Sequence, residues 1–287
     1  MPRNIIINSS NYNASNNCFR YQLPVAQKFE NKEVGLAYIS IYNSFYNIST
    51  EYGNNTIHLE FPIGAGNTTF TFTIPDGYYS YNDLSYFLQQ QMIANGLYLI
   101  SGSGASATNV YFVSIALNSV QYKEQLNFFP VPTSAQRTSL GLTATSNAVE
   151  APTTANNTPQ LTFNTSFGSL IGFPASTLPT TPTTTTSISI VSTITPQISV
   201  VNSLVLTTNL VNNFGLSNPS STFEGLALTG GFGSLITRSA GSVEYSDIAT
   251  NEYQYIEIKF HDQNINPLTL IDNDVLIILA IQDRNAR

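Results

Sequence analysis

The residue types that most often carry out acid–base and nucleophilic chemistry are few in this chain. Two histidines, His58 and His261, occur among 287 residues. His58 lies on the polar side of an alternating segment and His261 follows another such segment, so both are interpreted as surface residues rather than catalysts. A serine–histidine–acid triad is not excluded by counting, but the Gly-X-Ser-X-Gly turn that presents a nucleophilic serine in many hydrolases is absent.

Metal chemistry has little support from residue spacing. The single cysteine, Cys18, excludes an internal disulfide and cysteine-rich zinc sites, and no His-X-X-X-His pair occurs. Cys18 is interpreted as a small residue in or near a strand rather than as a reactive thiol. Asp262, Asp272, Asp274 and Asp283 form an acidic C-terminal region. Two interpretations stay open: solvated ends of strands, which we favour, or calcium ligands that loops bring together.

Other binding motifs are equally weak. The glycine-rich segments SGSGAS (101–106) and GGFGS (230–234) lack the lysine of a P-loop and the strand–helix setting of a dinucleotide site, so they are interpreted as turns. A glycosidase would need two buried carboxyl groups in an aromatic cleft, and tryptophan is absent from the chain. The sequence therefore predicts neither a catalytic site nor a cofactor site.

The charge balance narrows the classes of partner. The net charge is −7 and only 9% of residues are charged, so a basic nucleic-acid surface is not expected. A surface rich in Asn, Ser, Thr, Gln and Tyr suits large contact areas, because burying neutral groups avoids desolvating ions. Codon usage in an AT-rich genome is a second, compatible explanation. No secretory signal and no membrane span are recognised, so we expect a protein that is made and used without passing through a secretory pathway.

The elements around these residues are mostly strands. About nine or ten segments alternate between apolar and polar residues without a strand–helix rhythm, which favours an antiparallel sandwich. Residues 55–63 and 69–74 are predicted to form a hairpin. Asp274–Gln282 is apolar on both faces and is predicted to be a central strand. Residues 1–17 have no period and are interpreted as an extended arm. Residues 130–195 are rich in Pro and Thr, and are expected to be loops or a small inserted lobe.

One short helix interrupts this pattern within FTIPDGYYSYNDLSYFLQQQM (72–92). Pro75 ends the preceding strand. Ser80 and Asp83 have the spacing of a capping box. An apolar stripe follows, and Asn95-Gly96 supplies a C-terminal stop. The stripe consists of Leu84, Phe87, Leu88 and Met92. These features predict an amphipathic helix of about three to four turns that covers one open end of a sandwich.

Four segments between about residue 70 and the C-terminus carry a resemblance to a known family. The segments are the strand–turn–helix element at 72–92, SLIGFP (169–174), ISVVNSLVLTTNL (198–210) and KFHDQNINPLTLIDNDVLIILAIQDR (259–284). They resemble, in the same order, segments of the penton (minor capsid) proteins of virophages and Polinton-like viruses, most closely the Mavirus-type virophage pentons.

This resemblance implies a single jelly roll of about eight core strands over residues 1–287. It also implies a structural, non-enzymatic role. Five copies would close each icosahedral vertex of the virion beside the major capsid protein. The helix would plug one end of the jelly roll. Residues 1–17, and the tail 282–287, are expected to be assembly elements that become ordered on contact with neighbours.

Two other classes of function compete with this one. The first is a receptor- or glycan-binding β-sandwich displayed on a particle, which would need a polar pocket with aromatic walls or bound calcium. The second is a hydrolase built on a jelly-roll scaffold, which the scarcity of histidines disfavours. A fold does not by itself specify a function, so the structural role depends on the resemblance and on the missing catalytic motifs.

Overall fold

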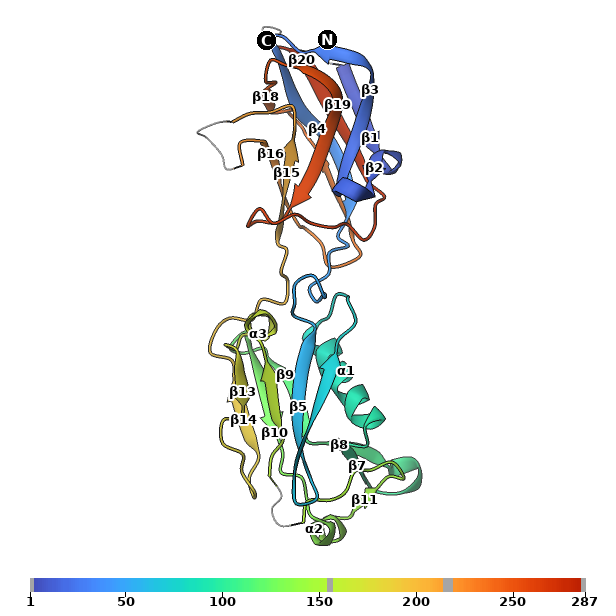
Figure 1. The fold of residues 1–287 in the computed structure, drawn as a ribbon, viewed down its shortest axis with the longest axis vertical. Helices are drawn as coiled ribbons and strands as arrows, with labels where there is room; N and C mark the ends of the chain where they lie inside the picture. The colour runs from blue at the N-terminus through green and yellow to red at the C-terminus, as the bar shows by residue number, and fades with distance from the viewer. Residues whose placement is uncertain (1–2, 154–156, 214–218, 285–287) are drawn as a thin grey trace. The chain divides into compact units, whose positions relative to one another are not determined.

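A computed structural model describes residues 3–153, 157–213 and 219–284 (Figure 1). Strands and loops dominate these residues, and every pair of strands is antiparallel. The α-helices in the described ranges are α1 (Tyr81–Ala94), α2 (Ser134–Ser139) and α3 (Thr165–Ile171). Short 3-10 turns are η1 (Ser9–Asn11), η2 (Ala14–Asn16) and η3 (Gly104–Ser106). The predicted all-β class is confirmed.

The chain divides into two compact units. Residues 1–45 and 201–287 form the first unit, and residues 46–200 form the second. The buried apolar residues separate into two clusters along the same boundary, so each unit has its own core. The single domain predicted over residues 1–287 is therefore divided into two units. Two cores arise because the apolar faces of the strands within 46–200 pack against one another, and the apolar faces of the remaining strands pack separately within the first unit.

The first unit is a sandwich of two antiparallel sheets. The first sheet has the order β1 (Arg3–Asn8), β20 (Leu276–Asp283), β4 (Lys32–Tyr42) and β17 (Leu235–Ser239), and the short β18 (Tyr245–Asp247) also pairs with β4. The second sheet has the order β16 (Thr222–Ala227), β15 (Ser203–Thr208), β19 (Glu252–His261), β3 (Cys18–Lys28) and β2 (Tyr12–Asn13). Alternate residues of both sheets point inward, which gives the strands their period of two.

The strand order of this unit is that of a jelly roll. Its eight principal strands, in chain order, are β1, β3, β4, β15, β16, β17, β19 and β20. Numbered one to eight in that order, they form sheets with the orders 1-8-3-6 and 5-4-7-2. This interleaving of consecutive strands between two sheets is the double Greek key of a jelly roll. The predicted fold is therefore present, and residues 46–200 are inserted between its third and fourth strands, β4 and β15.

The two ends of the chain are built into the first sheet. β20 lies between β1 and β4, which confirms the central strand predicted at Asp274–Gln282. β1 pairs with β20 along its whole length, and Ile7 is fully buried in the core. The predicted extended arm at residues 1–17 is thus corrected for residues 3–17, which contain strands and 3-10 turns. Residues 1–2 lie outside the described residues.

The second unit contains three small sheets. One sheet has the order β13 (Ser176–Leu178), β12 (Gln160–Phe163), β5 (Thr56–Ile63) and β6 (Gly66–Thr73). Another has the order β14 (Ile188–Val191), β10 (Lys123–Phe128) and β9 (Val113–Asn118). A further sheet has the order β11 (Leu142–Ala144), β7 (Tyr98–Ser101) and β8 (Thr108–Tyr111). The predicted hairpin is the β5–β6 pair. Within residues 130–195, β12 pairs with β5, β14 with β10 and β11 with β7. The described part of this region is thus neither loop alone nor a separate lobe.

Helix α1 has the predicted capping box and apolar stripe but a different role. Ser80 and Asp83 cap each other's backbone amides, and Leu84, Leu88 and Met92 are buried. These side chains belong to the core of residues 46–200, where α1 packs against β9. The predicted plug of the jelly roll is therefore wrong, because the helix buries its stripe in the other unit. Gly96 ends the helix at φ +69°, and a Cβ there would meet the carbonyl oxygen of Asn147 at 1.9 Å.

The ends of the inserted unit are tied together by Asn47, which is almost completely buried. Its Nδ2 donates to the carbonyl oxygens of Ile198, at 2.9 Å, and Tyr79, at 2.8 Å. Its Oδ1 accepts from the backbone N–H of Tyr79 at 2.8 Å. One amide thus joins the segment that enters the unit, the segment that leaves it and the tyrosine-rich turn before α1. Among the described residues, no helix is long and apolar enough to cross a membrane.

Candidate functional site: a pocket and a sheet face of the jelly roll

The two histidines lie apart, in different units. His58 is in β5, and its Nδ1 is 2.9 Å from the hydroxyl of Thr71 across the hairpin. His261 ends β19, and burial lowers the pKa of its imidazole. Its Nδ1 is buried without a hydrogen-bond partner in the described structure. The two rings therefore do not form a shared site.

Cys18 occupies the strand position that the sequence predicted. It begins β3, is buried, and lies 3.4 Å from Oε2 of Glu257. Burial, reinforced by this carboxylate, raises the pKa of the thiol, so Cys18 is protonated and poorly nucleophilic. Burial also opposes ionisation of Glu257, but hydrogen bonds from Arg20 and Lys259 hold the pKa of Glu257 below its usual value.

The C-terminal aspartates organise loop backbone. Asp262 accepts hydrogen bonds from the backbone N–H groups of Asn264 and Asn266, both at 2.8 Å. Asp272 accepts from the N–H of Asp274 at 2.9 Å. Asp283 pairs with Lys32 instead. No group of three or more metal-ligating side chains gathers anywhere in the described ranges.

The outer face of the first sheet carries no charged side chain over its central rows. Strand pairing places Ile6 beside Ile278 and Ile278 beside Tyr38, and it places Leu235 beside Tyr42. We call this surface the uncharged face; it comprises Asn4, Ile6, Asn8, Tyr38, Ser40, Tyr42, Leu235, Thr237, Ser239, Leu276 and Ile278. Ile6 is 54% exposed and Leu235 is 50% exposed. Such apolar exposure on one sheet is typical of a contact surface.

The outer face of the second sheet has the opposite character. Arg20 lies across from Glu257 in the β3–β19 pairing, and their side chains form an ion pair at 2.7 Å. Lys259 contacts the other oxygen of Glu257 at 3.2 Å, and the Arg20 guanidinium stacks 4.2 Å from the centre of the Tyr255 ring. One sandwich therefore presents a charged face and an uncharged face.

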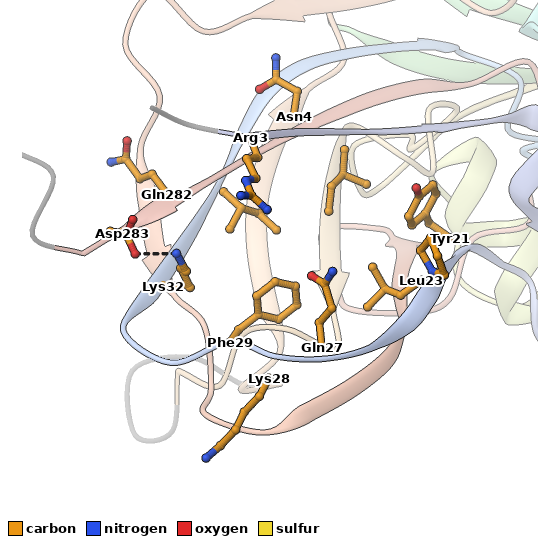
Figure 2. Close-up of a pocket in the computed structure, with 13 residues that line it drawn as sticks. Arg3, Asn4, Tyr21, Leu23, Gln27, Lys28, Phe29, Lys32, Gln282 and Asp283 are labelled. Carbon is orange, nitrogen blue, oxygen red and sulfur yellow. Dashed lines mark hydrogen bonds and ion pairs between the residues drawn. The ribbon is translucent and has the colours of Figure 1, made fainter.

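A pocket of about 720 Å³ opens between the edges of the two sheets (Figure 2). Its lining comes from β1, β3, β20, the start of β4 and the connection between β3 and β4. Ile5, Leu23, Phe29 and Ile281 supply apolar side chains to it. The pocket therefore exposes part of the apolar interior of the sandwich at the side where β1 is an edge strand and β2 covers only Cys18 and Phe19 of β3.

Cations outnumber carboxylates around this pocket. Lys32 pairs with Asp283 at 2.5 Å, and that hydrogen bond lowers the pKa of the Asp283 carboxyl. Lys28 pairs with Glu30. The side chain of Arg3 forms no hydrogen bond or ion pair with a described residue, although its charge helps to lower the pKa of Asp283. In a chain of net charge −7, the lining of this pocket thus has more cationic than anionic side chains.

The second unit hides one further titratable group, Glu124 in β10. Its side chain is fully buried, and neither carboxylate oxygen has a hydrogen-bond partner in the part of the chain that the structure describes. Burial raises its pKa from 4.5 to about 7. Burial, together with the nearby Glu124, also raises the pKa of the Tyr81 hydroxyl at the start of α1.

The sequence analysis missed the uncharged face, the pocket and Glu124. The first two depend on which strands become neighbours, and no local pattern specifies that. A signal for Glu124 was present: Glu124, Leu126 and Phe128 share one face of an alternating strand, so an acid stands where an apolar residue is expected.

Comparison with known proteins gives structural likeness alone. No protein-family model matches the chain, and no curated protein does. The crystal structure of the mavirus penton protein is similar over 98% of both chains, with a TM-score of 0.43 and 10% identity. A chain in the cryo-EM structure of the Sputnik virophage is similar over 99% of this chain and 98% of that one, with a TM-score of 0.41 and 12% identity. The jelly-roll assignment itself follows from the strand order.

Proposed function

We propose that this protein is a structural subunit of a viral capsid, made in the host cytoplasm, that forms homopentamers at icosahedral vertices beside the major capsid protein. The observation that carries the proposal is the jelly roll with one uncharged face. The four sequence segments that resemble virophage pentons support the same role.

Charge favours the uncharged face as a contact between copies. Each copy has a net charge of −7, so two copies repel each other at most surfaces. A contact over the uncharged face avoids both like-charge repulsion and the desolvation of ions. In a closed ring of five, this face meets a different surface of the neighbouring copy, because ring contacts are heterologous.

The proposal is tested by the mass of the purified protein in light scattering, alone and mixed with the major capsid protein. We expect a species of five chains, either alone or within shells. Ile6→Lys and Leu235→Lys should each weaken the ring at least tenfold, because every contact then buries a charge. Gln22→Lys, which adds the same charge to the charged face, is the matched control.

Two outcomes would contradict the proposal. One is a wild-type chain that stays monomeric and never joins a shell. The other is a ring that Ile6→Lys and Leu235→Lys leave as stable as Gln22→Lys does, which would remove the uncharged face from the interface.

A further inference from the structure

The pocket between β1 and β3 contains side chains whose hydrogen-bonding capacity is unused. The side chains of Arg3, Tyr21 and Gln27 line it, and none of these three side chains forms a hydrogen bond with a described residue. Arg3 adds a positive charge that forms no ion pair with the described residues, although it acts on the Asp283 carboxyl from a distance. Unused donors above an apolar floor are what a ligand site needs, because they fix orientation while the floor supplies apolar contact.

The backbone beside the pocket is also unpaired. β1 ends the first sheet, so within the described residues its outer edge has no neighbouring strand. On the other side of the pocket, β2 pairs only with Cys18 and Phe19 of β3, which leaves the rest of that edge open. A free edge presents a row of N–H and C=O groups to which an extended segment can add.

We propose that an extended acidic segment of another protein chain binds here as an added strand beside β1. Arg3, Ile5 and Ile7 alternate toward the inside of the sandwich, so inward residues of the added strand lie next to them. A carboxylate opposite Arg3 forms an opposite-charge cross-strand pair. The inward residue two positions away then lies opposite Ile5, where an apolar side chain fills the floor. The partner therefore carries an acidic and an apolar residue two positions apart.

This inference involves the jelly roll alone and does not depend on the proposed function. It is tested by selecting a displayed library of random eight-residue peptides on the intact chain. We expect enriched peptides to share an Asp or Glu two positions from an apolar residue. A synthetic peptide of that consensus should bind in fluorescence anisotropy, and Arg3→Glu should weaken it at least tenfold. A peptide with Lys in place of the acid should prefer the Arg3→Glu variant.

The controls separate binding from folding. Asn8→Ser changes β1 at a residue that does not line the pocket, and it should leave the affinity unchanged. Should Arg3→Glu melt earlier than the wild type in circular dichroism, Arg3→Gln replaces it. The proposal is overturned if no peptide is enriched, if the enriched peptides lack an acid, or if Arg3 variants bind them equally. Displacement of the consensus peptide by sodium decanoate, with equal saturation by decanoate alone, would instead identify an anionic amphiphile as the ligand.

Discussion

At the scale of single residues, Glu124 is unusual because its acidic side chain is fully buried rather than exposed to solvent. Its backbone is paired, because its N–H donates to the Ser192 hydroxyl at 3.1 Å and its carbonyl accepts from the Ser192 N–H at 2.7 Å. Its carboxyl group has no such partner among the described residues, and burial raises its pKa to about 7, so it is mostly neutral below that pH. Water solvates this group when the chain unfolds, so the folded state loses stability wherever only the unfolded chain is ionised.

The pH dependence follows from the direction of that shift. Well below pH 4.5 Glu124 is protonated in both states, so its ionisation does not change stability with pH. Between pH 4.5 and about 7 the unfolded chain ionises first, so the free energy of unfolding falls as pH rises. The total loss of unfolding free energy across this pH range is about 3 kcal/mol as an upper bound. We expect Glu124→Gln to be as stable as the wild type at pH 4 and more stable at pH 8.

Urea denaturation at several pH values measures this effect. Gln keeps the shape of Glu without its charge. The difference in the free energy of unfolding between the variant and the wild type at each pH therefore reports the ionisation of Glu124. If this difference in unfolding free energy stays constant from pH 4 to pH 8, folding does not raise the pKa of Glu124.

At the scale of elements, β20 shows how a central strand is specified. It is apolar on both faces because its inner residues enter the core and its outer residues belong to the uncharged face. Ile277 and Leu279 are buried, whereas Ile278 points outward and is only partly buried. A charge at position 278 is therefore a weaker test of the central strand than a charge at position 277.

We expect Ile277→Asp to abolish soluble folding of the jelly roll. An unpaired carboxylate in this core costs several kcal/mol, which is comparable with the whole stability of a domain. Leu276→Asp is the matched control, since Leu276 is 36% exposed on the outer face. Soluble expression and the circular dichroism of both variants measure the outcome. A folded Ile277→Asp variant would mean that β20 does not face the core as described.

At the scale of the whole molecule, a jelly roll accommodates an insertion of residues 46–200 because the insertion buries its own core. The two ends of the insertion are close together, since Asn47 donates to the Ile198 carbonyl at 2.9 Å. A short connection between β4 and β15 can therefore replace the insertion without moving either strand. Deleting residues 1–17, by contrast, removes β1 and Ile7 from the core, so that deletion cannot separate assembly from folding.

We expect the jelly roll to fold when residues 46–200 are replaced by a four-residue Gly-Ser linker. Its circular dichroism should be that of a β protein, and its thermal unfolding should be cooperative. Removing residues 56–73 alone is the informative comparison, because it deletes β5 and β6 and exposes the core of the inserted unit. A linker variant that is unfolded at 25 °C would show that the two units depend on each other.

The sequence by itself determined the local elements of this protein. Alternation with a period of two specified strands such as β5, β6 and β20. The Ser80–Asp83 box and the stripe through Leu84 specified α1, because capping and amphipathicity act within a few residues. Within residues 130–195 the local pattern did not predict strands such as β12. β12 is only four residues long in a Pro- and Thr-rich context, and its pairing with β5 stabilises it.

Only the tertiary structure decided which elements meet. The partner of β1 is more than 260 residues away in β20, and β4 lies next to β17 across the whole insertion. Such pairings depend on how non-local apolar faces are buried together, and no local pattern encodes them. The uncharged face, the pocket beside Arg3 and the placement of α1 in the second unit all follow from those pairings. The sequence therefore predicted the jelly roll through a resemblance, and the long-range packing determined where the uncharged face and the pocket lie.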